Sequence, residues 1–310
     1  MMNIPVEYLD HAGKTTNPTY SLSRIGFIKH LAMAGQGYAL RPQKLMRTLG
    51  MYLHYSSYLQ RTSFNANHFS QPPAGLSDPT EKGQFSNLAG KAIADFLSKR
   101  IGNSFFTVGY EGAMRLAGFP VEGGRPDLIA YSPTSMFAIE AKGRSQGSSG
   151  DMVEHKEQSQ EGPIAVNYSV AAVSYNLYNQ VACKYHDPIN GEVRYDNDAL
   201  GRASRIYYSG LSEFLKQEIF ESQKINIKDE QFYEISLDKR KLDKIFPEEF
   251  PFGLLWHHEI FGFYQPKLIL PANINDLAKN GVSNEIRPFT PIDADGLYID
   301  TDRIGLSIAR

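Results

Sequence analysis

Cysteine is almost absent from this sequence, which has Cys183 alone among its 310 residues. A single thiol can form neither an intramolecular disulfide nor a cysteine-rich zinc site, and such usage is typical of a reducing cytoplasm. Any metal site must therefore use oxygen or histidine ligands. The sequence also lacks an apolar run near the ~18 residues that a membrane-spanning helix needs, so we expect no membrane association.

Residues 1–7 contain no basic stretch followed by an apolar segment, so they predict no secretory signal, and we expect a cytoplasmic location. The composition, 42% hydrophobic and 21% charged, is that of a soluble globular protein. The net charge of −2 conceals an asymmetry, because residues 1–75 carry seven lysines and arginines against two acids. This local excess of positive charge indicates a basic lobe.

Three units are expected along the chain. Apolar residues recur at helical spacing around residues 25–32 and 45–53, which predicts two or three helices in the basic lobe. The Pro/Gly/Ser-rich segment 69–77 is typical of a boundary. We therefore predict a basic helical lobe (1–75), an α/β core (76–200) and a C-terminal α/β extension packed on that core (201–310).

The core is predicted to mix helices and strands. Asp78, Pro79 and Glu81 have the spacing of a helix N-terminus, and an apolar stripe continues this helix to about residue 100. A short polar helix is expected over residues 151–160, and a long amphipathic helix over residues 202–223. The β-prone runs lie at residues 105–108, 128–131, 137–141, 164–173 and 181–185. This order predicts a central mixed sheet flanked by helices.

Two of these runs are joined by a four-residue turn, which predicts a β-hairpin. Pairing Tyr131 with Met136 and counting outward places Asp127 opposite Glu140. Opposed Cβ atoms in such a ladder lie roughly 5 Å apart, so the two carboxylates would repel each other. Lys142 shares the face of Glu140, because side chains two residues apart on a strand point the same way. A divalent cation held by both acids would relieve the repulsion.

Two acids, a lysine and a cation are the groups that hydrolysis of a phosphodiester requires. The motif Pro126-Asp127, twelve intervening residues, then Glu140-Ala141-Lys142 resembles the PD-(D/E)XK, or restriction-endonuclease-like, nuclease superfamily over about residues 78–185. The resemblance implies that Asp127, Glu140 and the Ala141 carbonyl bind a catalytic Mg²⁺, for which Mn²⁺ can substitute. It also implies that Lys142 acts on water or on the phosphate.

The superfamily commonly has a glutamate on the helix before its core strands, and Glu81 occupies the matching place as a further candidate catalytic residue and metal ligand. The Asp78-x-x-Glu81 spacing is equally that of a capping box, in which the glutamate accepts from the backbone N–H of Asp78. Some branches carry a supporting glutamine on the following helix, where Gln158 and Gln160 lie. The polarity of an exposed helix explains these glutamines as well.

Several cations are candidate contacts to nucleic acid, although each is also explained as a solvated charge. Those of the basic lobe are expected to hold the DNA backbone, or to help a partner subunit hold it. The candidates are Arg125, Arg144 and Lys156 around the motif, and Arg41, Lys44 and Arg47 in the basic lobe.

The sequence thus predicts a metal-dependent endonuclease that hydrolyses DNA. By resemblance its role is prokaryotic restriction or phage defence, as a homodimer or with a partner subunit. One alternative is a nucleic-acid-binding subunit that keeps the nuclease fold with little or no turnover, and another is a hydrolase of a different phosphate ester. The intact set of Asp127, Glu140 and Lys142 favours turnover, and the basic lobe favours nucleic acid.

Overall fold

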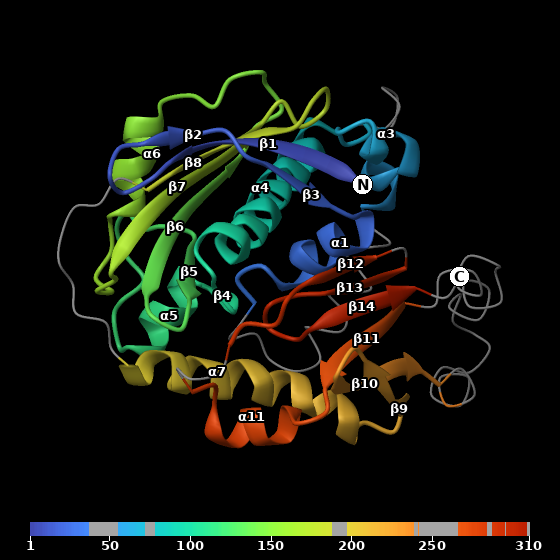
Figure 1. Cartoon of the computed structure of the whole chain (residues 1–310). Helices are drawn as coiled ribbons and strands as arrows, with labels where there is room; N and C mark the ends of the chain where they lie inside the picture. Colours follow the sequence, from blue (N-terminus) through green and yellow to red (C-terminus); the bar gives the residue numbers. More distant parts are fainter. Residues whose placement is uncertain are drawn as a thin grey trace.

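The computed structural model describes residues 1–36, 55–71, 78–187, 197–238, 241, 266–283, 287–294 and 296–308. Within these ranges the chain is a mixed α/β protein with a large mixed sheet flanked by helices (Figure 1). The strand order is β2-β1-β8-β7-β6-β5-β4, with β3 also paired to β1. Its strands are β1 (Met2–Leu9), β2 (Thr15–Thr16), β3 (Thr19–Leu22), β4 (Phe106–Gly109), β5 (Leu128–Tyr131), β6 (Met136–Gly143), β7 (Tyr168–Tyr175) and β8 (Ala182–His186).

The pairs β1–β8 and β6–β7 are parallel, and the other neighbouring strands of this sheet are antiparallel. The expected mixed central sheet is therefore confirmed. The helices of the described residues are α1 (Arg24–Met33), η1 (Ser56–Leu59), α3 (Arg61–Asn65), α4 (Pro79–Ile101), α5 (Tyr110–Leu116), α6 (Met152–Ser159), α7 (Asn197–Ser212), η2 (Glu213–Lys216) and α11 (Ile274–Asn280).

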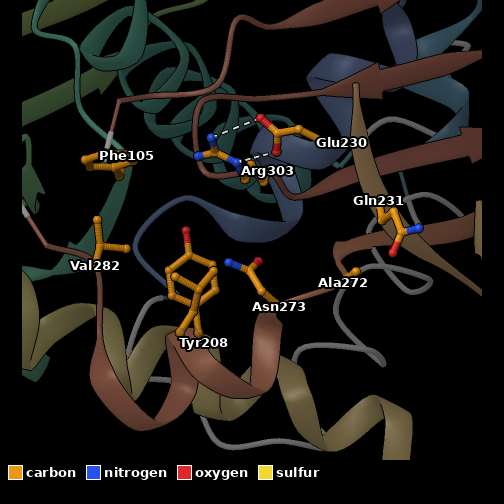
Figure 2. A pocket seen from close by; sticks show the side chains of 9 residues that line it. Phe105, Tyr208, Glu230, Gln231, Ala272, Asn273, Val282 and Arg303 are labelled. Atoms are coloured by element: carbon orange, nitrogen blue, oxygen red, sulfur yellow. Dashed lines mark hydrogen bonds and ion pairs between the residues drawn. The ribbon is translucent and has the colours of Figure 1, made fainter. Parts of the chain in front are cut away.

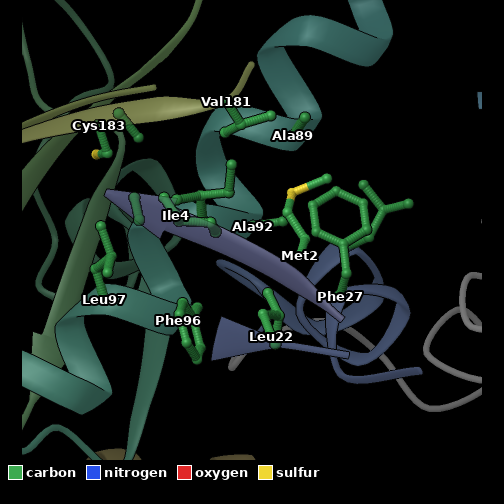
Figure 3. Packing of buried hydrophobic residues seen from close by; sticks show 14 of the residues in the cluster. Met2, Ile4, Leu22, Phe27, Ala89, Ala92, Phe96, Leu97, Val181 and Cys183 are labelled. Atoms are coloured by element: carbon green, nitrogen blue, oxygen red, sulfur yellow. The ribbon is translucent and has the colours of Figure 1, made fainter. Parts of the chain in front are cut away.

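Helix α4 begins where its sequence predicts. The Asp78 side chain accepts from the backbone N–H of Thr80 at 2.8 Å, Pro79 occupies the first turn, and the helix ends before Gly102. Its apolar stripe packs on one face of the sheet together with β1, β3 and α1 (Figure 3). Cys183 of β8 is buried in this cluster as a packing residue.

Alternate residues of β6 face opposite sides of the sheet. Phe137, Ile139 and Ala141 pack in the cluster formed with α4, whereas Ala138 packs in a second cluster on the other face. Because side chains alternate along a strand, Glu140 and Lys142 project from the face opposite α4. Helix α6 packs against β6 and β7.

A second, smaller sheet follows in the chain and has the order β12-β13-β14-β11-β10-β9. Together with α7 and α11 it lies below the large sheet in Figure 1. Residues of α7, α11, β4 and α5 share one apolar cluster, so this C-terminal part packs against β4 and α5. The strands are β9 (Phe220–Ile227), β10 (Glu230–Leu237), β11 (Pro266–Pro271), β12 (Ile292–Ala294), β13 (Leu297–Ile299) and β14 (Gly305–Ile308).

The prediction that the basic lobe is helical is wrong for its first residues. Strand β1 pairs with β8 inside the large sheet, and the stripe near residues 25–32 forms an expected helix, α1. The burial of Met2, Ile4 and Val6 has a period of two, which is the strand pattern that the helical interpretation overlooked. Residues 45–53, and residues 72–77 of the expected boundary, lie outside the described residues.

The helix expected over residues 202–223 is also displaced. Helix α7 begins at Asn197 and ends at Ser212, and β9 starts at Phe220 to form a hairpin with β10. Ile206 of this helix is 42% exposed, whereas its neighbours Tyr207 and Tyr208 are buried. The two tyrosines take the inward face because both hydroxyls donate to Asp302.

Buried charges connect α1, α4 and the turn between β13 and β14. Lys29 of α1 lies 3.2 Å from Asp300 and 2.9 Å from Asp302. Lys99 of α4 lies 3.0 Å from Asp300, 3.3 Å from Asp302 and 3.6 Å from Asp95. Because buried charges are tolerated only when paired, these contacts fix the helices and the turn against one another. We call Lys29, Asp95, Lys99, Arg100, Asp300 and Asp302 the ionic cluster.

Helix α4 also approaches β6 very closely at two glycines. A Cβ atom on Gly90 would overlap the backbone of Lys142 and Gly143, and one on Gly143 would overlap the backbone of Ser86. Only glycine permits this distance between the helix and the strand that carries Glu140 and Lys142.

This contact gives a test with a matched control on the same helix. Gly90→Ala should destabilise the protein by about 1–3 kcal/mol, because the added methyl has no space. Gly83→Ala, at an exposed helical position with nothing near the added methyl, should stabilise it by up to about 1 kcal/mol. Denaturant unfolding of both variants measures the difference. Equal stability of the two variants would contradict the close helix–strand approach.

Candidate active site

The β5–β6 hairpin has the register that the sequence predicts. Tyr131 pairs with Met136, and the ladder continues through Ala130–Phe137 and Ile129–Ala138 to Leu128–Ile139. Asp127 comes directly before Leu128 in the chain, and its backbone N–H donates to the carbonyl of Ile139 at 3.1 Å. Asp127 therefore lies beside the segment that carries Glu140.

The Asp127 carboxylate is held by two groups. Its Oδ2 atom accepts from the backbone N–H of Ala141 at 3.1 Å, and its Oδ1 atom lies 2.7 Å from Nζ of Lys91. Lys91 belongs to α4 and reaches Asp127 where the chain enters β5. Sequence reasoning missed Lys91, because its position in an amphipathic helix carries no signal beyond that of an ordinary helical lysine.

Glu140 is the most unusual group of the site, because its side chain is 1% exposed. It forms an ion pair with Lys142, yet its Oε2 atom has no hydrogen-bond partner within the described part of the chain. Burial, and next the negative charge of Asp127, raise the pKa of Glu140 from 4.5 to about 7, while Lys142 and Lys91 act in the opposite direction. The site thus contains a buried carboxylate whose ionised form is costly.

A pocket of about 500 Å³ opens at Asp127. Its lining comes from four parts of the chain: Lys91 of α4, Tyr110 of α5, Arg125 of the segment before β5, and Gln158 of α6. Gln158, which the sequence offered both as a supporting glutamine and as an ordinary polar residue of an exposed helix, lies at this pocket. Asp127 faces the pocket, while Glu140 is buried and does not belong to the lining.

The groups present fit a hard divalent cation. Asp127 and Glu140 supply carboxylate oxygens, and one Glu140 oxygen is buried without a partner. The N–H of Ala141 points toward Asp127, and the N–H and carbonyl of one strand residue point to the same side, so the Ala141 carbonyl also faces Asp127. Across the residues that the structure describes, no three or more His, Cys, Asp and Glu side chains are arranged so that they could hold a metal ion by themselves. Mg²⁺ typically binds through one or two carboxylates and completes its shell with water and substrate.

The structure does not bring Glu81 together with these residues. Glu81 lies in the first turn of α4 beside Tyr58; burial, followed by the charge of Glu81, raises the pKa of Tyr58 to about 12. A helix rises about 1.5 Å per residue, so Glu81 is about 15 Å along the axis from Lys91, the α4 residue at Asp127. This placement favours a structural role for Glu81.

The candidate nucleic-acid contacts differ in their placement. Arg125 lines the pocket and pairs with Glu111. Arg144 places Nη2 2.8 Å from Nε2 of His155. Lys156 is 9% exposed and donates to the carbonyl and hydroxyl of Ser169, so it lacks the exposure that contact with a phosphate requires. The other three candidates, Arg41, Lys44 and Arg47, lie outside the described residues.

A second pocket, of about 390 Å³, lies between α7, α11 and the start of β10 (Figure 2). Glu230 is the acidic residue in its lining, and it is bound by Arg303 through Nε at 2.7 Å and Nη2 at 3.1 Å. Both oxygens of the Glu230 carboxylate are thus bound by the one guanidinium of Arg303. The described lining of this pocket therefore lacks a carboxylate oxygen without a partner, such as the one on Glu140.

Comparison of the chain with protein families, with curated proteins and with solved structures gives no match. Within the described ranges, no helix combines the length and the apolar character that crossing a membrane requires.

The raised pKa of Glu140 predicts how the metal-free protein responds to pH. The carboxyl group of Glu140 binds its proton more tightly in the folded state than in the unfolded state. Glu140 therefore does not lower the free energy of unfolding below pH 4.5, and it lowers that free energy increasingly as the pH rises to about 7. Above that pH the cost is about 3 kcal/mol. With a chelator present, Glu140→Gln should therefore stabilise the protein more at pH 8 than at pH 5.

Denaturant unfolding at both pH values measures this difference. Glu157→Gln, at an exposed position of α6, is the control and should leave the pH dependence of the wild type unchanged. Parallel pH profiles for wild type and Glu140→Gln would contradict the buried, charge-repelled state of Glu140.

Proposed function

We propose that this chain is a divalent-metal-dependent nuclease that hydrolyses DNA phosphodiester bonds. The observation that carries the proposal is the buried Glu140 carboxylate, with one oxygen unpartnered, between Asp127 and Lys142. Like charges placed together in a desolvated site are typical of a cation-binding catalytic centre. The order α4, β4, α5, β5, β6, α6, β7 supports the resemblance to the PD-(D/E)XK superfamily, which has a helix before and a helix after its core strands, although α5 here interrupts those strands.

In this proposal the Asp127 and Glu140 carboxylates and the Ala141 carbonyl hold Mg²⁺ or Mn²⁺. A bound ion of this kind polarises the phosphate and makes nearby water more acidic. Lys142, whose side chain is 32% exposed, donates toward the attacking water or toward the phosphate oxygen on which charge develops. The pocket beside Asp127 receives the phosphodiester. Glu81 has no part in this site.

The role in prokaryotic restriction or phage defence comes from the resemblance alone, as does action with a second copy or a partner subunit. The alternative of a DNA-binding subunit without turnover differs in one measurable way. Such a protein binds DNA but leaves it intact in Mg²⁺ and in Mn²⁺. A hydrolase of another phosphate ester would instead release product from a small phosphodiester and leave DNA intact.

Lys142→Ala should lower DNA cleavage by about 10²–10⁴-fold, because the lysine acts on water and phosphate. The variant should still fold, but its unfolding midpoint should fall, because it removes the ion-pair partner of the buried Glu140 carboxylate, so cleavage is compared well below that midpoint. Cleavage of plasmid and of short duplexes in Mg²⁺, Mn²⁺ and EDTA provides the measurement. Lys216→Ala, at a side chain that is 63% exposed, is the control and should cleave at the wild-type rate. Wild-type cleavage by Lys142→Ala would remove it from the catalytic site.

The excess positive charge of residues 1–75 supports a second proposal, that these residues hold the DNA backbone. If they neutralise about four phosphates, log affinity should fall against log salt with a slope of about −3.6, because each contact releases condensed counterion. Replacing Arg41, Lys44 and Arg47 together by Ala should weaken binding on all sequences alike and flatten that slope.

Binding isotherms over a range of salt concentrations measure the slope. The matched control replaces three exposed lysines of the C-terminal part by Ala, and it should keep the wild-type slope: Lys216, Lys224 and Lys228. If the control variant flattens the slope as much as the replacement of Arg41, Lys44 and Arg47, the effect reflects net charge rather than a DNA contact in the basic lobe.

A further inference from the structure

The proposed metal site contains a second lysine that the resemblance does not include. Lys91 lies 2.7 Å from Oδ1 of Asp127, while Lys142 pairs with Glu140. When Glu140 is ionised, two carboxylates and two ammonium groups therefore balance one another in charge. The site is close to electroneutral before any divalent ion enters it.

Both oxygens of Asp127 are engaged in this arrangement. Oδ1 faces Lys91, and Oδ2 accepts from the backbone N–H of Ala141. A divalent cation at Asp127 would stand within a few ångströms of the Lys91 ammonium, where its repulsion is twice that between two monovalent charges. Lys91 and the metal therefore compete for Asp127.

Lys91 has a place to move to. Its side chain is 38% exposed, and it lines the same pocket as Asp127, Arg125 and Gln158. A lysine has a flexible four-carbon stem, so its ammonium can leave Asp127 and stay in the pocket without a change in the helix. In that position it faces the space that the proposed function gives to the phosphodiester.

We propose that Lys91 is a resident counter-cation of Asp127, which the divalent metal displaces and which then pairs with the substrate phosphate. This inference rests on the proposed function. The displaced lysine and the metal together add positive charge to the pocket, and an anionic substrate neutralises it. Metal and substrate consequently strengthen each other's binding, and the coupling is reciprocal. Lys91 is a positioning residue, distinct from Lys142, which acts on the reacting atoms.

The test measures Mn²⁺ binding to the full chain by titration calorimetry, with and without a duplex oligonucleotide whose phosphorothioate linkages resist cleavage. Lys91→Met should raise the Mn²⁺ affinity about 10-fold or more without DNA, which is within the range for residues that tune a metal ligand. It should also reduce the gain in Mn²⁺ affinity that DNA produces in the wild type. Mn²⁺ affinity in Lys91→Met equal to or below that of the wild type would overturn the inference.

Two further variants separate charge competition from a general effect on α4. Lys91→Arg keeps the cation and should retain both the weaker Mn²⁺ binding and the coupling to DNA. Lys82→Met removes a lysine of the same helix that lies over the Tyr178 ring, 4.6 Å from its centroid, and should behave as the wild type. Enhanced Mn²⁺ binding in Lys82→Met would assign the effect to net charge and contradict a specific role of Lys91.

Failure of this inference is distinguishable from failure of the proposed function. Glu140→Gln should abolish Mn²⁺ binding if the site is a metal site at all. Binding that survives Glu140→Gln, or its absence in the wild type, would overturn the proposed function and the role of Lys91 with it. Binding that is lost in Glu140→Gln but unchanged in Lys91→Met would leave the metal site standing and remove Lys91 alone.

Discussion

The arrangement of this protein depends on charges that are buried together. The ionic cluster combines three cations and three carboxylates from α1, α4 and the turn after β13. His30 completes it: burial lowers its pKa, so a neutral ring contacts Asp95 at 2.6 Å and the Tyr298 hydroxyl at 2.7 Å. Each charge is tolerated only while its partners are present, so residues near both ends of the chain must be in place for α4 to be fixed.

Helix α4 connects the ionic cluster to the candidate site. One part of the helix holds Asp95 and Lys99 in the ionic cluster, and the preceding turns bring Gly90 against β6 and Lys91 against Asp127. The helix therefore sets both the position of the strand that carries Glu140 and the counter-charge of Asp127. The ionic cluster, which lies outside the pocket, thus fixes the helix that brings Lys91 to Asp127.

Local patterns predicted the parts of the fold that local interactions decide. The cap of α4, the β5–β6 register and the polar helix α6 each follow from residues a few positions apart, and the juxtaposition of Asp127 with Glu140 follows from that register. Strand β1 was missed because the alternation of Met2, Ile4 and Val6 was overlooked, and its pairing with β8 could not be seen because the two strands lie about 180 residues apart in the sequence. The roles of Lys91 and of the ionic cluster were missed because their partners also lie far away in the sequence. The residues next to a helical lysine do not indicate which carboxylate it will pair with in the folded chain.

The buried carboxylate of Glu140 lowers the stability of the protein, and the neighbouring lysines offset only part of this cost. An ionised Glu140 with an unpartnered oxygen costs folding free energy that an apolar or amide side chain would not. Lys142 and Lys91 offset part of that cost, but neither satisfies the second oxygen of Glu140. Packing alone gives no reason to place a carboxylate there, whereas a cation shared with Asp127 gives one. This unrelieved cost of the second Glu140 oxygen is what the proposed cation would offset, and it supports that proposal.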